Sequence, residues 1–166
     1  MTLHKIKSRE ELAKIVQDLK AQGKKVITTN GTFDLTHPGH VSSLENIKKE
    51  SGADVLIVGV NSDSSVKRYK SDKRPFVGEE HRVRMVAALE AVNYATIFNE
   101  TDPCALLEQL KPNMHAKGKD WENKVCPEKE VVERNGGKMV FIDSGSPVTT
   151  TGIIQKILDV MKEEVN

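Results

Sequence analysis

Residues 28–40 read TTNGTFDLTHPGH, and the interpretation of the whole chain starts from this stretch. The run at 25–29 is rich in β-branched residues, which is typical of a strand, Gly31 marks a turn, and Pro38 suits the first turn of a helix. A strand that turns at a glycine and enters a helix forms an anion site, because backbone N–H groups and the helix dipole both point at the ligand. The stretch therefore predicts a phosphate-binding loop, to which His37 and His40 add two imidazoles.

The composition bounds the class of protein. The 166 residues are 37% hydrophobic and 30% charged, so we expect one domain over 1–166, with an N-terminal helix in 1–24 and a core in 25–166. Aromatic residues make up only 4% and the formal net charge is +1, which argues against nucleic-acid and membrane partners. No apolar run is long enough to span a bilayer. With no secretory signal and no CxxC pair formed by Cys104 and Cys126, the expected location is the cytoplasm.

Strand and helix patterns alternate along the chain. Residues 54–60, DVLIVGV, form the continuous apolar run of a strand buried on both faces of a parallel sheet. Residues 8–21 predict an amphipathic helix with a capping box of Ser8 and Glu11, which serves either packing or a subunit contact. Residues 61–78 predict a long loop with one helical turn. The further predicted helices are 38–51, 79–91, 103–110, 127–134 and 151–163, and the further strands are 94–98, 114–117 and 138–142.

This alternation predicts an α/β fold with a doubly wound parallel sheet. Right-handed crossovers place the carboxyl ends of all strands at one edge of such a sheet, and ligands bind there. We therefore expect three loops to converge: the histidine stretch, the loop that begins at Asn61 and the loop around Lys117.

The histidine pair has more than one interpretation from residue types alone. Asp34, His37 and His40 could ligate a metal, although no further His, Cys or carboxylate motif completes such a site. The histidines could also be satisfied within the structure, and Asp34 could serve only the turn. Gly39, which has no side chain, would let a planar ring or a phosphate approach the backbone.

The motifs resemble those of the cytidylyltransferase-like nucleotidyltransferases, which have an HxGH motif and a Rossmann-like fold. The chain is similar over nearly its whole length to the D-glycero-β-D-manno-heptose 1-phosphate adenylyltransferase domain of ADP-heptose synthase. In many members that domain is fused to a sugar kinase, and we expect this chain to be a stand-alone version. The matching stretches are TNG at 29–31, GTFD at 31–34, HPGH at 37–40, VNSD at 60–63, SVKR at 65–68, RP at 74–75, Arg82, ALEAV at 88–92, KG at 117–118, Asp120 and TTTGII at 149–154.

The resemblance implies transfer of AMP from ATP to a sugar 1-phosphate, with release of pyrophosphate. Because the acceptor phosphate is already an anion at neutral pH, the reaction needs in-line placement and neutralisation of charge at the α-phosphate more than a strong base. His37 and His40 are expected to serve the triphosphate and its transition state, and Thr32 and Phe33 to donate backbone N–H groups. Mg²⁺ is expected to arrive with ATP, held mainly by phosphate oxygens and water, and we assign it no protein ligand.

Further candidates follow the second predicted strand. The resemblance implies that Lys67 binds phosphate as a third catalytic residue and that Arg82 contributes to nucleotide phosphate binding. Arg74 and Asp63 are the candidates for substrate binding. Without the resemblance, the basic run at 67–74 could be a solvated face, and Asp63 could merely cap the following turn.

The loop after the fourth predicted strand is expected to line the base and ribose. Gly118 allows close approach, and Asp120 could accept hydrogen bonds from ribose hydroxyls or an exocyclic amine. Trp121 either packs in the structure or, as in the glycerol-phosphate cytidylyltransferases, leaves the choice between ATP and CTP open. The last predicted helix begins with hydroxyl residues that cap it or complete a triphosphate site: Thr149, Thr150 and Thr151.

Other functions remain as alternatives. A CTP:glycerol-3-phosphate cytidylyltransferase and an ATP:FMN adenylyltransferase use the same motif, and a nucleotide-binding regulatory module would keep the fold without the reaction. Residues 143–146, DSGS, stand where the cytidylyltransferases have an arginine, which argues against the first alternative. The expected partners are therefore ATP and a sugar 1-phosphate, and the resemblance adds a homodimer, to which the N-terminal helix could contribute.

Overall fold

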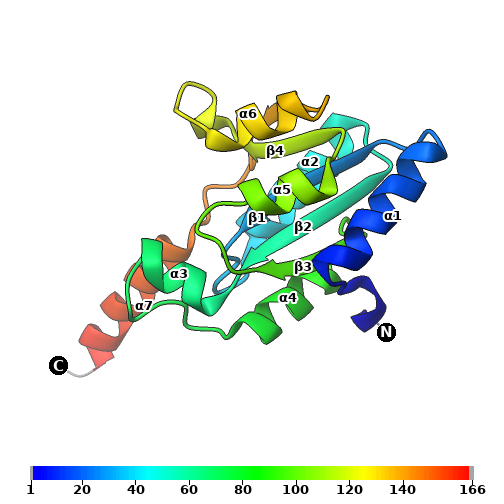
Figure 1. Cartoon of the computed structure of the whole chain (residues 1–166). Coiled ribbons are helices and arrows are strands. Elements are labelled where there is room, and N and C mark those ends of the chain that lie inside the picture. The colour runs from blue at the N-terminus through cyan, green and yellow to red at the C-terminus, as the bar shows by residue number, and fades with distance from the viewer. Residues whose placement is uncertain (1, 165–166) are drawn as a thin grey trace.

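A parallel sheet with helices on both faces makes up the fold of the computed structural model, which describes residues 2–164 (Figure 1). Its strands lie in the order β3-β2-β1-β4-β5, and every neighbouring pair is parallel. The predicted α/β class and doubly wound parallel sheet are confirmed. The strands are β1 (Val26–Gly31), β2 (Val55–Asn61), β3 (Tyr94–Phe98), β4 (Met114–Gly118) and β5 (Lys138–Ile142).

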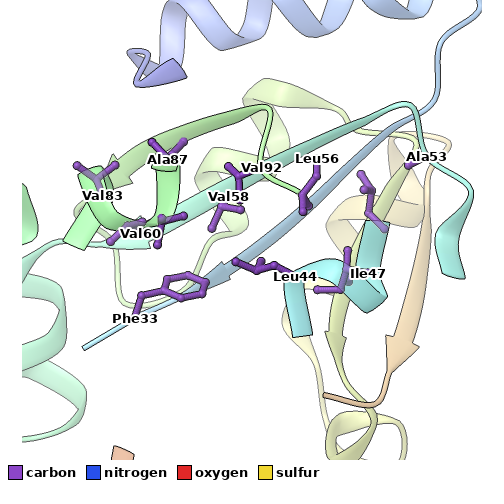
Figure 2. Close-up of a cluster of buried hydrophobic side chains, with 14 of the residues drawn as sticks. Phe33, Leu44, Ile47, Ala53, Leu56, Val58, Val60, Val83, Ala87 and Val92 are labelled. Carbon is purple, nitrogen blue, oxygen red and sulfur yellow. The ribbon is translucent and has the colours of Figure 1, made fainter. Parts of the chain in front are cut away.

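Strand β2 shows why the sheet forms a core on both faces. Every one of its residues is buried, and because side chains alternate across a strand, its apolar run supplies both sides. On one face, Leu56, Val58 and Val60 pack with residues of α2 (Pro38–Ser51) and α4 (Glu79–Ala88). Figure 2 shows this cluster, in which Leu44 of α2 and Val83 of α4 point toward the strand.

The opposite face is covered by α1 (Arg9–Ala21), α5 (Cys104–Leu110) and α6 (Pro127–Arg134). The predicted capping box of α1 is confirmed: Ser8 Oγ accepts from the Glu11 N–H at 3.1 Å, and Glu11 Oε2 accepts from the Ser8 N–H at 2.8 Å. Leu12 and Val16 are fully buried against α5 and the sheet. Of the two roles that the sequence allows for this helix, packing is the one that the structure shows.

The segment 61–78 departs from its prediction as a loop with one helical turn. It contains α3 (Asp63–Tyr69), a helix capped by Ser62, whose Oγ accepts from the Ser65 N–H at 3.1 Å. The sequence of α3 shows no apolar stripe at helical spacing, because the buried residues of this helix are Ser65 and Val66. Helix α4 also ends at Ala88, before the predicted end at residue 91.

The carboxyl ends of β1, β2 and β4 meet at one edge of the sheet. The final helix, α7 (Thr150–Glu164), begins at this edge and extends away from the sheet (Figure 1). Its apolar residues Ile157, Leu158 and Met161 are exposed. Within residues 2–164, no helix combines the length and the apolar character needed to cross a membrane.

Candidate active site

The loop after β1 is held in a strained conformation by its own side chains. Phe33 and Leu35 both have positive φ angles, 52° and 49°, a region that costs energy for residues other than glycine. Phe33 is nevertheless 7% exposed and belongs to the hydrophobic core, with its ring 5.3 Å from that of His40. Burial of the ring therefore offsets the strain and fixes the backbone at the start of the predicted phosphate loop.

Asp34 ties this loop to the segment before α4. Its carboxylate accepts from the N–H groups of Phe76 and Val77 at 3.0 and 3.1 Å and from Arg74 Nε at 2.8 Å. Burial raises the pKa of Asp34, but these donors outweigh it and hold the pKa below its usual value. Asp34 is thus a buried structural anion, and Arg74, predicted to bind substrate, is its ion-pair partner.

His37 and His40 lie face to face. Their ring centroids are 3.8 Å apart at an interplanar angle of 26°. His37 is the N-cap of α2, and its Nδ1 accepts from the Gly39 N–H at 3.1 Å. Burial lowers the pKa of His37, and burial together with the neighbouring charges of His37 and Lys70 lowers the pKa of His40 to about 4. Both imidazoles are therefore neutral at pH 7 in the free protein.

His40 keeps a ring nitrogen for a ligand. Its Nδ1 is buried and has no hydrogen-bond partner among the described residues, and the same is true of Asn30 Oδ1. A buried polar atom without a hydrogen-bond partner costs free energy. His40 and Asn30 both line one hollow, so we infer that a ligand in this hollow pairs with His40 Nδ1 and Asn30 Oδ1. The alternative of histidines satisfied within the structure does not fit His40.

Gly39 is required by the chain itself. A Cβ atom at this position would lie far inside van der Waals contact of the carbonyl oxygen of Val148. The sequence suggested that a ring or a phosphate approaches here, whereas the structure brings the segment before α7 against the start of α2. This contact positions the three threonines beside the phosphate loop.

The three threonines at 149–151 have different surroundings. Thr149 Oγ1 accepts from the Gly152 N–H at 3.1 Å and so caps the helix end. Thr150 Oγ1 donates to the Asp34 carbonyl at 3.1 Å, which joins α7 to the loop after β1. Thr151 is exposed. The structure thus brings the threonines to the histidine loop, and the first two also have structural hydrogen bonds.

Arg82 is fully buried and already hydrogen-bonded within the protein. Its Nε donates to the Val77 carbonyl at 2.8 Å, its Nη1 to the Thr32 carbonyl at 2.5 Å and its Nη2 to Asp63 Oδ1 at 2.7 Å. The resemblance implied direct phosphate binding by Arg82 and a substrate contact by Asp63. In this structure Arg82 and Asp63 form an ion pair, and the hydrogen bond from Arg82 to the Thr32 carbonyl supports the backbone of the phosphate loop.

Two hollows open on either side of the end of β1. The α2-side hollow has a volume of about 200 Å³ and is walled by Phe33, His40 and Leu44. The α6-side hollow has a volume of about 440 Å³ and carries Lys70 on its wall. The two share the following lining residues: Asn30, Gly31, Thr32, Lys117 and Trp121. The loops after β1, β2 and β4 therefore converge at the sheet edge, as the sequence predicted.

The predicted catalytic Lys67 is not part of this convergence. It lines a separate hollow with Asp63, Gly78 and Glu79 on the flank of α3. The lysine that the structure brings to the histidines is Lys70, whose pKa desolvation lowers, as does the nearby Arg74 charge. The sequence placed both lysines in one basic run, whereas in the structure Lys67 lies within α3 and Lys70 follows its end at Tyr69, so the two line different hollows.

The loop after β4 is arranged around Lys117. The Lys117 Nζ lies 2.5 Å from Glu128 Oε1 and 4.0 Å from the centroid of the Trp121 ring. Gly118 faces Asp120, whose Oδ1 would lie 2.6 Å from an added Cβ. The Asp120 carboxylate itself is exposed and pairs with Lys124 at 3.1 Å. Gly118 and Trp121 thus line the α2-side hollow, whereas Asp120 is not among its lining residues.

The comparisons with known proteins identify the family of the chain. Residues 28–156 match the cytidylyltransferase-like family, a span that contains the histidine loop and the threonines. The chain belongs to this family. It is therefore a nucleotidyltransferase with the Rossmann-like fold that the resemblance implied.

Named relatives agree with the family assignment. The chain is 44% identical over 96% of its length to "Bifunctional protein HldE" of Geobacter metallireducens and 41% identical over 93% of its length to the protein of that name from Pelobacter propionicus. The nucleotidyltransferase spans about a third of the length of these relatives.

Two solved structures share the fold. A lipopolysaccharide core biosynthesis protein from Thermoplasma volcanium superposes with a TM-score of 0.61 at 27% identity, over 72% of this chain and 97% of that one. A pantoate-beta-alanine ligase from Francisella tularensis superposes with a TM-score of 0.56 at 17% identity, over 89% of this chain and 69% of that one, and shows the fold alone.

The metal site that the sequence suggested, with Asp34, His37 and His40 as ligands, lies in the part of the chain that the structure describes. Among residues 2–164, no group of three or more His, Cys, Asp or Glu side chains could hold a metal ion. Of the three ligands that the sequence suggested, Asp34 is committed to Arg74 and backbone N–H groups, and His37 Nδ1 to Gly39. Asp34 and His37 Nδ1 are therefore not free to form the metal site that the sequence suggested with His40.

Sequence reasoning missed four residues of this site: Asn30, Lys70, Lys117 and Glu128. Asn30 and Lys117 stand inside motifs that the resemblance matched, and Lys70 is in the basic run, so a signal existed for these three. Glu128 resembled an ordinary first-turn helix carboxylate, and no pattern in the sequence marks it as buried.

Proposed function

We propose that this nucleotidyltransferase transfers AMP from ATP to D-glycero-β-D-manno-heptose 1-phosphate, giving ADP-heptose and pyrophosphate. The observation that carries the proposal is the stacked His37–His40 pair beside two hollows that share one wall. Motifs along nearly the whole chain and the identity to "Bifunctional protein HldE" support the heptose substrate. The name of the Thermoplasma relative, a lipopolysaccharide core biosynthesis protein, supports a product used for surface glycans.

The two hollows suit two substrates that meet at the end of β1. The α2-side hollow has the apolar walls Phe33 and Leu44 together with Trp121, which suit a nucleoside. The α6-side hollow has Lys70 and hydroxyl groups on its walls, which suit a phosphorylated sugar. The α-phosphate would then lie between them, against the backbone of Gly31 and Thr32.

The reaction needs no strong base. An oxygen of the acceptor phosphate attacks the α-phosphorus in line, the bond from that phosphorus to the oxygen of the β-phosphate breaks, and pyrophosphate leaves with the electron pair. Neutral His40 donates a ring N–H to a phosphate oxygen, and binding of these anions raises the pKa of both imidazoles. Mg²⁺ accompanies ATP and neutralises charge on its phosphates. Thr32, Phe33, Gly118 and Asp120 remain proposed nucleotide contacts, with Thr149 to Thr151.

A screen of nucleotides against acceptors tests the proposal. ATP and CTP are each combined with heptose 1-phosphate, glycerol 3-phosphate and FMN, and pyrophosphate release is measured. We expect ATP with heptose 1-phosphate to give the highest kcat/KM. Faster turnover with CTP across the acceptors would overturn the choice of nucleotide, and faster turnover with FMN would overturn the choice of acceptor.

His40→Ala tests the mechanistic part. Loss of one preorganised hydrogen-bonding group commonly costs about 10²–10³ in turnover, so we expect at least that loss with an unchanged circular dichroism spectrum. His81→Ala is the matched control, because His81 is exposed on α4 and lines the separate hollow. Full activity of the His40 variant would contradict the role of the histidine pair.

The remaining proposals concern the setting of the reaction. We propose one nucleotidyltransferase unit over 1–166 that acts in the cytoplasm, where ATP and sugar phosphates are found. We also propose a homodimer, for which the exposed apolar residues Ile157, Leu158 and Met161 of α7 offer support, since Leu12 and Val16 of α1 are used in the core. Light scattering coupled to gel filtration measures the mass in solution, and a monomer at micromolar concentration would contradict the dimer.

A further inference from the structure

A buried carboxylate, Glu128, lines the α6-side hollow next to the wall that the two hollows share. The Glu128 side chain is 3% exposed, and both of its oxygens are occupied. Oε1 lies 2.5 Å from Lys117 Nζ, and Oε2 accepts from the thiol of Cys126 at 2.9 Å. Burial raises the pKa of Glu128, but the thiol and the ammonium outweigh it and keep the pKa below the usual value, so the carboxylate is ionised at pH 7.

The ammonium connects this carboxylate to the mouth of the site. Lys117 is 13% exposed and lies on β4, a rigid element of the sheet, while its Nζ reaches both the carboxylate and the face of Trp121. A cation over an indole face is attracted to it, and this contact is 4.0 Å from the ring centroid. Lys117 is thus held on one side by Glu128 and on the other by the indole.

Trp121 lies on a short segment with few buried residues. It lies in a three-residue 3-10 turn, η2 (Lys119–Trp121), which has no fully buried residue, and Trp121 as a whole residue is 37% exposed. The residues that follow, 122–125, are exposed as well. Two ammonium groups lie over its ring, that of Lys117 at 4.0 Å and that of Lys124 at 5.2 Å from the centroid, and Lys117 is the nearer and the more buried of the two.

We propose that Glu128 is a positioning residue for the nucleotidyl transfer site: it fixes the Lys117 ammonium, and the ammonium fixes the Trp121 ring at the wall shared by both hollows. Cys126 completes the arrangement by occupying the second carboxylate oxygen. The inference rests on the proposed function for its catalytic consequence, because both substrates would contact this wall. Its structural consequence can be measured with no substrate present.

Trp121 reports on its own position, because it is the single tryptophan of the chain. The experiment uses the full chain and compares its tryptophan emission and acrylamide quenching with those of Glu128→Gln. We expect the variant to emit at longer wavelength and to be quenched more strongly, because the released ring becomes more solvated. Glu130→Gln is the matched control, since Glu130 lies on the same helix with its side chain 85% exposed, and it should match the parent.

The cysteine provides a second pair of variants. Cys126→Ser keeps a donor to Oε2 and should retain the parental emission, whereas Cys126→Ala removes the donor and should shift emission in the direction of Glu128→Gln. If Glu128→Gln fails to fold, the comparison of Cys126→Ser with Cys126→Ala tests whether Glu128 positions Trp121. Identical emission and quenching of Trp121 in the parent and in every folded variant would overturn the proposal.

Kinetics then separate positioning from a merely structural role. A small displacement of positioning groups commonly costs about 10²-fold in rate, so we expect kcat/KM of folded Glu128→Gln to fall at least about tenfold, with Cys126→Ser close to the parent. Shifted fluorescence with unchanged kcat/KM would overturn the catalytic consequence. If the parent releases no pyrophosphate with any substrate pair, the proposed function fails, and the fluorescence result still decides whether Glu128 positions Trp121.

Discussion

Replacement of Arg82 by methionine separates the two roles that sequence and structure give to this residue. The resemblance implied that Arg82 binds phosphate directly, whereas the structure shows a fully buried guanidinium that joins three segments. Arg82→Met keeps the aliphatic length and removes the charge and the hydrogen bonds. We expect it to lower the free energy of unfolding by far more than a surface substitution does.

The magnitude follows from the partners. Removing one member of a buried ion pair costs about 3–5 kcal/mol, and each carbonyl left unpaired, on Val77 and Thr32, costs about 1–3 kcal/mol. These costs overlap, and the Asp63 side chain is 38% exposed and regains water, so the lower end applies. We expect a loss of about 3 kcal/mol, which is a large part of the roughly 5–15 kcal/mol typical of a domain.

Urea unfolding followed by circular dichroism measures this loss. With a dependence of about 1–3 kcal/mol per M urea, the midpoint should fall by about 1–3 M. Arg84→Met is the control, because Arg84 is exposed on the same helix and such changes stay within about 0.5 kcal/mol. An unchanged midpoint for Arg82→Met together with a raised KM for ATP would refute the structural role and restore direct phosphate binding.

Three further outcomes are expected. Gly39→Ala should lower the free energy of unfolding by about 1–3 kcal/mol and reduce turnover, because its Cβ would clash with the Val148 carbonyl; a variant with parental urea midpoint and kcat would contradict this contact. Burial lowers the pKa of His115 to about 4. The unfolded chain therefore binds a proton below about pH 6.5 that the folded chain does not, and stability should fall by up to about 1.4 kcal/mol per pH unit between about pH 6.5 and 4. Urea midpoints measured across that range should show a smaller slope for His115→Gln, and an equal slope would count against the assignment. Finally, Lys70→Met should reduce kcat/KM more than Lys67→Met, and the reverse order in the pyrophosphate assay would favour the sequence-based choice of Lys67.

Much of the fold could be predicted because its signals are local. The apolar run at 54–60 and the capping box of Ser8 and Glu11 depend on neighbours in sequence, and both appear in the structure where expected. The missed helix α3 has the opposite character. Its buried residues are Ser65 and Val66, and its position depends on packing against the rest of the molecule rather than on a stripe of its own.

By itself the sequence determined the alternating fold, the family and the three loops that meet at the sheet edge, since period, caps and motifs are properties of short stretches. Only the tertiary structure decided which charged groups face a ligand and which face each other. Arg74, Arg82 and Asp63 were expected at the substrates, and each is engaged in an internal ion pair. The physical reason is that a charge buried by folding must be paired or hydrogen-bonded, and its partners lie 19 to 40 residues away in the chain. The stretch at 28–40 indicates the type of reaction, and distant residues hold that stretch in place.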